Sequence, residues 1–254
     1  MKKLCGISIA RNAVKYDYCL KESLLSMLEV CDHVICAYVE CEDGTKELIE
    51  SIKSEKLQVM YLPDSEWDVH NNKFRLSYIT NIALAEAERL EYEYVIYVQA
   101  DEVLSERSAD SIKIGIDEGH EAYLVKRVNL WKSPYLQLDV PQERKPCSTE
   151  VIRLTKSCYR AYDDAENINA QTLLYIPTIV IYHMGFVRKR EIMKDKIINM
   201  QQGVFAMEHY DNKLDQCEIF NPDLWFDPKT DLKPIDEPLP KLIKEWAAER
   251  HYED

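Results

Sequence analysis

The sequence predicts an α/β fold with a Rossmann-like, mostly parallel central sheet and helices on both faces. Over the first 119 residues, short apolar runs alternate with segments whose apolar residues recur at helical spacing. Such alternation favours a parallel sheet. After about Gly119 the rhythm changes, which predicts a smaller mixed region of strands and loops. With 254 residues, 46% of them hydrophobic, the chain can bury one sizeable core.

The first half is expected to contain four strands, at residues 5–10, 34–39, 57–62 and 94–98. Helices are expected between them at residues 18–31, 45–54 and 76–90. The first helix has leucines at helical spacing, the second follows a turn at Asp43 and Gly44, and the third is rich in Ala, Leu and Glu. Pro63 ends the third strand.

In the second half, strands are expected at residues 122–130 and 150–154, with one or two more within 173–182. Residues 131–147 contain three prolines and read as a long loop, and residues 188–207 as a helix. From Asn221 onward, proline-rich segments and a short helix at 242–250 complete the chain. We therefore expect a single domain over residues 1–254, divided into a first half (1–119), a second half (120–220) and a C-terminal wrap (221–254).

The composition disfavours some partners and locations. The chain has 32 Lys and Arg against 45 Asp and Glu, a net charge of −13, which disfavours binding to nucleic acid or to an anionic membrane. No apolar stretch reaches membrane-spanning length, and the N-terminus leads into a strand rather than a signal peptide. The eight cysteines form no CxxC pair and are expected to be reduced thiols, which predicts a cytoplasmic protein.

Polar side chains follow three of the expected strands. Ala10, Arg11 and Asn12 follow the first strand, Glu40 ends the second, and Asp101 and Glu102 follow the fourth. The carboxyl ends of parallel strands share one edge, so these residues are expected to converge on one crevice. Carboxylates there suit Mg²⁺ or Mn²⁺ bridging a diphosphate, although turn formation or helix capping explains each residue singly. The missing GxGxxG and GxxxxGK[ST] motifs argue against a dinucleotide dehydrogenase and a P-loop nucleotidase.

Six segments in order carry a family resemblance. They are ISIARN (7–12), KESLLSML (21–28), CDHVI (31–35), DGT (43–45), TNIAL (80–84) and QADEVLS (99–105). Together they resemble family-2-like glycosyltransferases with the GT-A fold. The resemblance implies metal-dependent transfer of a sugar from a nucleotide-diphosphate sugar, most simply a UDP-sugar, to a hydroxyl acceptor such as a glycan, with inversion. It assigns the donor to residues 1–119 and the acceptor to residues 120–220.

The resemblance also implies a metal site. The family motif is usually Asp-x-Asp, and Gln99 stands here in its first position, so only Asp101 matches by identity. Asp101 is the implied ligand for Mn²⁺ or Mg²⁺, with Glu102 as a helper and His183 as a third ligand. The alternatives are an N-cap for Asp101, a surface carboxylate for Glu102 and a hydrogen-bonded core residue for His183.

The other donor contacts follow from the same resemblance. Glu40 is expected at the base or ribose, where a carboxylate accepts from an imide or a hydroxyl. Arg75 is favoured over Lys73 for the diphosphate because guanidinium pairs with phosphate in a bidentate manner. Arg188 is expected to face the diphosphate at the start of a helix. The implied donor-binding set is Ala10, Arg11, Asn12, Glu40, Arg75, Gln99 and Arg188.

The catalytic base is expected on an acidic segment of the second half. Asp164 matches the family's late acidic motif best, with Asp163, Glu166 and Glu150 as alternatives. A solvated acidic loop is the plainer interpretation in so acidic a chain. Trp131, Tyr135 and Trp225 are candidates for stacking on sugar rings or for packing.

Three other functions compete with this interpretation. One is a phage-type transferase acting on modified DNA bases through a basic groove at Lys126, Arg127 and Lys132. Another is an inactive GT-A-fold binding module, since Gln99 replaces an expected carboxylate. A nucleotidyltransferase is the third, and the lack of a glycine-rich phosphate loop weighs against it.

Overall fold

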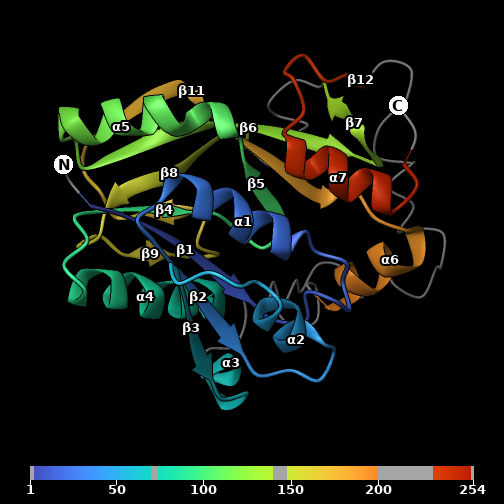
Figure 1. The fold of residues 1–254 in the computed structure, drawn as a ribbon, viewed down its shortest axis with the longest axis horizontal. Coiled ribbons are helices and arrows are strands. Elements are labelled where there is room, and N and C mark those ends of the chain that lie inside the picture. The colour runs from blue at the N-terminus through green and yellow to red at the C-terminus, as the bar shows by residue number, and fades with distance from the viewer. Residues whose placement is uncertain (1–2, 70–73, 140–147, 200–230, 253–254) are drawn as a thin grey trace.

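The computed structural model describes residues 3–69, 74–139, 148–199 and 231–252 of the chain. Its first half alternates strands and helices as expected (Figure 1). The elements are β1 (Leu4–Ala10), α1 (Leu20–Val30), β2 (His33–Val39), α2 (Thr45–Glu50), β3 (Leu57–Leu62), α3 (Ser65–Asp68), α4 (Phe74–Arg89) and β4 (Tyr94–Tyr97). Strands β4, β1, β2 and β3 are adjacent in this order and all parallel.

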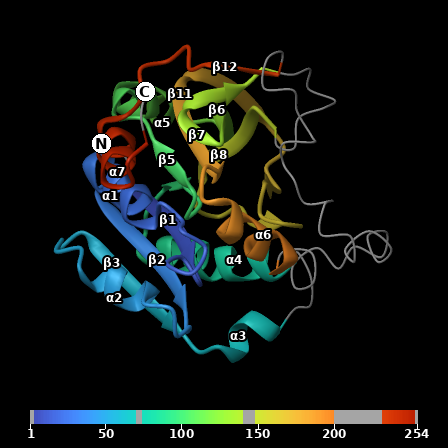
Figure 2. The same ribbon diagram turned by 90° about the vertical axis from the view of Figure 1, so that its right-hand side faces the viewer.

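Helices cover both faces of this parallel sheet because successive side chains of a strand point to opposite faces. Val34 and Cys36 of β2 belong to the core that contains α1, whereas Ile35 and Ala37 belong to the core that contains α4. Figure 2 shows α1 and α4 on opposite sides of β1 and β2. Each fully buried leucine or isoleucine in these cores contributes about 1.5–3 kcal/mol, so the two cores hold the sheet edge in place.

The second half extends the same sheet with mixed pairing. Its elements are β5 (Glu102–Leu104), η1 (Glu106–Ser108), α5 (Ala109–Glu118), β6 (Ala122–Trp131), β7 (Ser133–Leu138), β8 (Glu150–Lys156), β9 (Ala161–Tyr162), β10 (Asn167–Ile168), β11 (Leu173–Phe186), α6 (Arg190–Asn199), β12 (Leu232–Pro234) and α7 (Lys241–Glu249). The ten-stranded sheet has the order β12-β7-β6-β8-β4-β1-β2-β3, and β11 pairs with β6 and β5. This is the α/β, GT-A-like architecture expected from the sequence, with a region of mixed pairing after the parallel half.

Several expected boundaries are wrong. The segment expected to be a loop contains β7, which forms a hairpin with β6 through Lys132 at φ 61°. Strand β11 continues to Phe186, α2 ends at Glu50, and β5 was not expected as an element. The structure describes α6 only as far as residue 199. Lys73 and Trp225 lie outside the described residues, as do residues 140–147 of the expected loop, 200–207 of the expected helix and 221–230 of the wrap.

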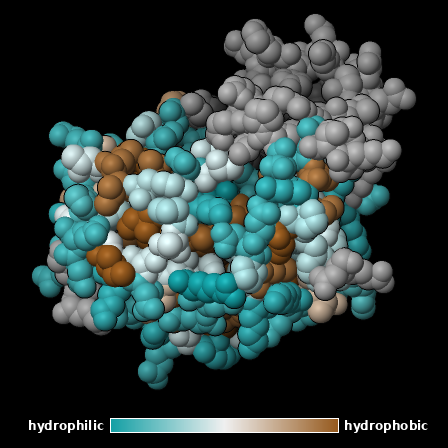
Figure 3. Space-filling view, turned by 90° about the horizontal axis from the view of Figure 1, so that it is seen from above, coloured by the Kyte–Doolittle hydropathy of each residue, from teal (hydrophilic) through white to brown (hydrophobic). Residues whose placement is uncertain are grey.

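The face of the molecule seen from above is mostly hydrophilic, with apolar residues in several small groups (Figure 3). Figure 3 shows these groups on the upper face of the molecule, separated by hydrophilic side chains. Leu173, Leu174 and Tyr175, at the start of β11, are among the exposed large hydrophobic residues. Within the described parts of the chain, no helix is long and apolar enough to cross a membrane.

Candidate functional site

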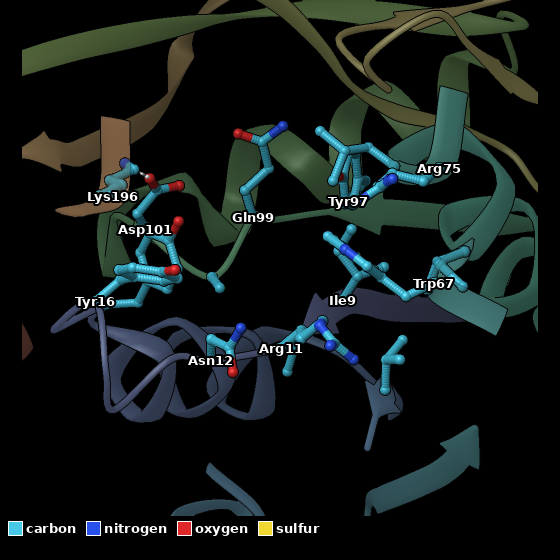
Figure 4. A pocket seen from close by; sticks show the side chains of 16 residues that line it. Ile9, Arg11, Asn12, Tyr16, Trp67, Arg75, Tyr97, Gln99, Asp101 and Lys196 are labelled. Atoms are coloured by element: carbon cyan, nitrogen blue, oxygen red, sulfur yellow. Dashed lines mark hydrogen bonds and ion pairs between the residues drawn. The ribbon is translucent and has the colours of Figure 1, made fainter. Parts of the chain in front are cut away.

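A cavity of about 360 Å³ lies at the carboxyl ends of β1 and β4. These strands are parallel neighbours, so the segments that follow them lie side by side at one edge of the sheet. Figure 4 shows side chains from both segments around the same space. The cavity brings together six of the predicted residues: Ala10, Arg11, Asn12, Arg75, Gln99 and Asp101. Sequence reasoning missed five further polar or aromatic members of the wall: Tyr16, Tyr18, Trp67, Tyr97 and Lys196.

One end of the cavity combines an aromatic ring with two guanidinium groups. The Cζ atoms of Arg11 and Arg75 each lie 5.3 Å from the centroid of the Trp67 ring. Arg11 is held in place because its Nη1 donates to the Glu40 backbone oxygen at 2.7 Å and to the Asp64 carboxylate. Burial lowers the pKa of Arg75, Asp68 opposes that shift and Arg11 adds to it, but an arginine remains a cation.

The opposite end contains a buried ion pair between Asp101 and Lys196 (Figure 4). Lys196 Nζ donates to Asp101 Oδ2 at 3.0 Å and to the Gly185 backbone oxygen at 3.1 Å. It also lies 4.9 Å from the centroid of the Tyr18 ring. Burial alone would raise the pKa of Asp101, but Lys196 and His183 outweigh it and hold the pKa well below its usual range. Asp101 is therefore a carboxylate at neutral pH.

His183 is positioned by its place in the sheet. In the pairing of β11 it stands opposite Asn129 of β6 and Glu102 of β5. Its Nδ1 lies 3.0 Å from Asn129 Oδ1, while Asn129 Nδ2 donates to the Ser148 backbone oxygen at 3.2 Å. This network assigns the Nδ1 proton to His183, and the other ring nitrogen, Nε2, lies 3.8 Å from Asp101 Oδ2.

Gly185 lies against this imidazole. A Cβ at position 185 would meet His183 Nε2 at 2.2 Å, far inside van der Waals contact. Only a glycine at position 185 therefore lets the His183 imidazole lie so close to the backbone whose oxygen accepts from Lys196.

Glu102 is not available as the predicted metal helper. Its side chain is fully buried, and Arg153 donates to both of its carboxylate oxygens, from Nε and Nη2 at 2.9 Å each. Arg127 Nη1 lies 3.4 Å from Oε1, and the Gln99 backbone N–H donates to Oε2 at 3.1 Å. The alternative interpretation of Glu102 as a surface carboxylate is also wrong, because the side chain is fully buried. Glu102 pairs with two buried arginines, Arg127 and Arg153, and is therefore not part of the candidate site.

Gln99 links the cavity to a buried ionic cluster formed by Glu102, Arg127, Arg153 and Glu166. Its Nε2 donates to Glu166 Oε1 at 3.0 Å. Glu166 also accepts from Arg127 at 2.8 Å and from Arg153 at 3.1 Å. Burial alone would raise the pKa of Glu166, but the two arginines outweigh it and lower the pKa to about 2. A carboxylate so stabilised is a poor proton acceptor, so Glu166 is not a candidate base.

Four other predicted residues lie outside the cavity wall. Arg188 is buried and donates to the backbone oxygens of Tyr16 at 2.6 Å and Met184 at 3.2 Å, so it supports the wall from behind. Glu40 and Glu150 are exposed. Asp164 accepts from the Glu166 backbone N–H at 3.2 Å, which places it next to the cluster that contacts Gln99.

Two of the three aromatic candidates for sugar stacking, Trp131 and Tyr135, do not line the cavity. Trp131 is 1% exposed and packs on Phe186, with ring centroids 4.4 Å apart. Tyr135 is partly buried against a core cluster near α7. Both residues therefore serve packing.

As the side chains stand, this end of the cavity does not form a site for a divalent cation. Among the described residues, no group of three or more His, Cys, Asp or Glu is placed to hold a metal. Asp101 and His183 are two suitable donors, but the Lys196 ammonium already pairs with Asp101 Oδ2, the oxygen that faces His183. A metal bound there would sit beside a fixed positive charge.

Comparison with known proteins gives matches only among solved structures. No family model matches the chain, and no curated protein matches it. TarS of S. aureus is 16% identical with a TM-score of 0.45, covering 79% of this chain and 40% of that one, so the chain spans about 40% of the length of TarS. Glucosyl-3-phosphoglycerate synthase from Mycobacterium tuberculosis, in complex with Mn²⁺, UDP and phosphoglyceric acid, is 13% identical with a TM-score of 0.48, covering 79% and 75%.

A third solved structure is 4-diphosphocytidyl-2C-methyl-D-erythritol synthase from Anaerococcus prevotii. It is 12% identical with a TM-score of 0.44, covering 78% of this chain and 96% of that one. Similarity at this level of sequence identity and TM-score does not indicate the substrate of this chain.

Proposed function

We propose that this chain is a glycosyltransferase that binds a nucleoside-diphosphate sugar in the cavity and transfers the sugar to a hydroxyl acceptor. The charge of the cavity wall is the observation that carries the proposal. Among the described residues of the wall, Arg11, Arg75 and Lys196 supply three positive charges and Asp101 one negative charge, and Asp64, which pairs with Arg11 from outside the wall, brings the balance to +1. The chain as a whole has a net charge of −13, so this concentration of cations marks a site for an anion such as a diphosphate.

The shape of the cavity suits a nucleotide. Its volume of about 360 Å³ lies within the range of small-molecule sites. The Trp67 ring and the Arg11 guanidinium offer flat surfaces on which a nucleobase can stack. We assign the base to this end, and the diphosphate to the space between Arg75 and Lys196. UDP-sugar remains the proposed donor.

We propose a single displacement with inversion. The acceptor oxygen attacks the anomeric carbon, the bond from that carbon to the diphosphate oxygen breaks, and the diphosphate leaves with the electron pair. The acceptor proton passes to a carboxylate, for which we propose Asp164 because it adjoins the cluster that contacts Gln99. Glu150 is exposed and outside the cavity wall, so it is the weaker choice.

The positions of Lys126 and Arg127 do not support the alternative of sugar transfer to DNA. Lys126 pairs with Glu237 at 2.7 Å, and Arg127 is buried in the ionic cluster. These two residues therefore do not form an exposed basic groove, which a DNA backbone requires.

Calorimetric titration with UDP, GDP and CDP tests the donor site. We expect one of the three to bind with a stoichiometry of one, and the matching monophosphate to bind more weakly because it offers less charge. If none of the three binds, the chain is not a transferase of this kind. Following release of the nucleoside diphosphate from UDP-glucose and other UDP-sugars then separates an enzyme from an inactive binding module.

A further inference from the structure

The Lys196 ammonium lies against the carboxylate of Asp101, 3.0 Å from Oδ2. The two residues are 95 positions apart in the sequence, and α6 brings the ammonium to the cavity wall. Lys196 is 7% exposed, and its ammonium is held by Asp101, by the Gly185 backbone oxygen and by the face of the Tyr18 ring. Burial with three favourable partners fixes the ammonium in one place.

We propose that the Lys196 ammonium replaces the metal at this site, so that the chain binds its nucleoside diphosphate without a divalent cation. This inference rests on the proposed function, because it assigns the diphosphate to the same cavity. Lys196 then neutralises charge on the bound diphosphate and on the diphosphate as it leaves, while Asp101 orients the ammonium.

The carboxylates that a metal needs are engaged elsewhere. Hard divalent cations are held mainly by negatively charged oxygens. The first position of the acidic motif is Gln99, whose amide donates to Glu166. Glu102 has both carboxylate oxygens bound by Arg153. Asp101 is the one carboxylate among the described residues of the cavity wall, and its ion pair with Lys196 has no net charge with which to attract a second cation.

The position of His183 shows what metal-dependent binding would mean for the structure. Its Nε2 faces Asp101 Oδ2 at 3.8 Å, too far for a hydrogen bond, and its Nδ1 is fixed by Asn129. That arrangement of the second ring nitrogen is also found in metal-bound histidines. If Lys196 moved away from Asp101, the histidine and the aspartate would offer two ligands to a metal. Metal dependence in the experiment below would therefore mean that the lysine is displaced.

Nucleotide titration with and without metal tests the proposal. The wild-type protein is titrated with UDP, GDP and CDP in EDTA and then in Mn²⁺. We expect the nucleotide that binds to do so in EDTA, with its affinity changed less than about threefold by Mn²⁺. Lys196→Met removes the charge and is expected to weaken binding in EDTA by at least about tenfold. Lys196→Arg keeps the charge and is expected to stay within a few-fold of the wild type.

The outcomes separate this inference from the proposed function. Binding only in Mn²⁺ overturns the inference and leaves the glycosyltransferase proposal standing. Equal binding by wild type and Lys196→Met in EDTA overturns the role of Lys196. Absence of binding in both buffers removes the proposed function itself. Circular dichroism checks that Lys196→Met is folded, and if it is not, the wild-type comparison between EDTA and Mn²⁺ decides the question.

Discussion

Replacing Glu102 with alanine distinguishes a structural carboxylate from a metal ligand. The substitution removes a fully buried group that accepts two hydrogen bonds from Arg153 at 2.9 Å, a contact from Arg127 at 3.4 Å and the Gln99 backbone N–H at 3.1 Å. Breaking a buried pair by deleting one partner typically costs about 3–5 kcal/mol, because the other charge remains buried. We therefore expect the free energy of unfolding to fall by about that amount.

Urea denaturation followed by circular dichroism measures this loss. With a urea dependence near 3 kcal/mol per molar, at the upper end for small proteins, the midpoint should fall by about 1–2 M. Glu118→Ala is a matched control, because Glu118 is exposed at the end of α5, and it should change stability by no more than about 0.5 kcal/mol.

A double substitution tests whether the loss of stability comes from leaving Arg153 buried without its partner. Glu102→Leu combined with Arg153→Met replaces both charges by apolar groups of similar size, and should recover much of the loss seen in Glu102→Ala. An unchanged urea midpoint in Glu102→Ala would refute the structural assignment. Loss of Mn²⁺ binding with full stability would restore Glu102 as a ligand.

Four further predictions follow from the site. Asp164→Asn should lower sugar transfer by about 10²–10⁴-fold with the nucleotide affinity unchanged, as measured by initial rates and titration, and an unchanged rate would remove Asp164 as the base. Gly185→Ala should displace the His183 ring that its Cβ would meet, cost about 1–3 kcal/mol in thermal unfolding and weaken nucleotide binding, and an unaltered protein would contradict the close contact. The pKa of Glu166 is lowered from 4.5 to about 2, so its stabilisation is complete above about pH 4.5 and is lost progressively as the pH falls from there through about 2. The urea midpoint of the wild type should therefore be lower at pH 3 than at pH 6, and equal midpoints would count against this. Arg75→Lys should weaken nucleotide binding about tenfold, since it keeps the charge but loses the planar fork, and equal affinities would exclude a bidentate contact.

The sequence predicted the part of the site that depends on local order along parallel strands. Arg11 and Asp101 each follow a strand end, and the parallel pairing of β1 with β4 is sufficient to bring them to one cavity. The strands themselves were predictable because apolar runs such as residues 94–98 are bounded by polar residues. The turn at Lys132 was not, because a positive φ there is usually marked by glycine or asparagine.

The long-range contacts of Lys196 and Glu102 could not be predicted from the sequence. Lys196 meets Asp101 only because α6 folds back over the end of β11, and no local pattern links the two residues. Glu102 looked like half of an acidic pair in a turn, although its partners Arg127 and Arg153 lie on β6 and β8. Long-range ion pairs of this kind depend on register between strands, which a single sequence does not specify. The one sequence sign of Lys196 was its place in the expected helix that follows the basic run after His183.

The most direct test of the central claim is a tryptophan fluorescence titration of the wild type and Trp67→Phe with UDP, GDP and CDP. Trp67 lines the cavity between Arg11 and Arg75, while Trp131 and Trp246 are buried elsewhere. We predict a saturable fluorescence change with one nucleoside diphosphate in the wild type, and loss of most of that change in Trp67→Phe. No saturable change with any of the three, or the same change in both proteins, would contradict a nucleotide site in this cavity.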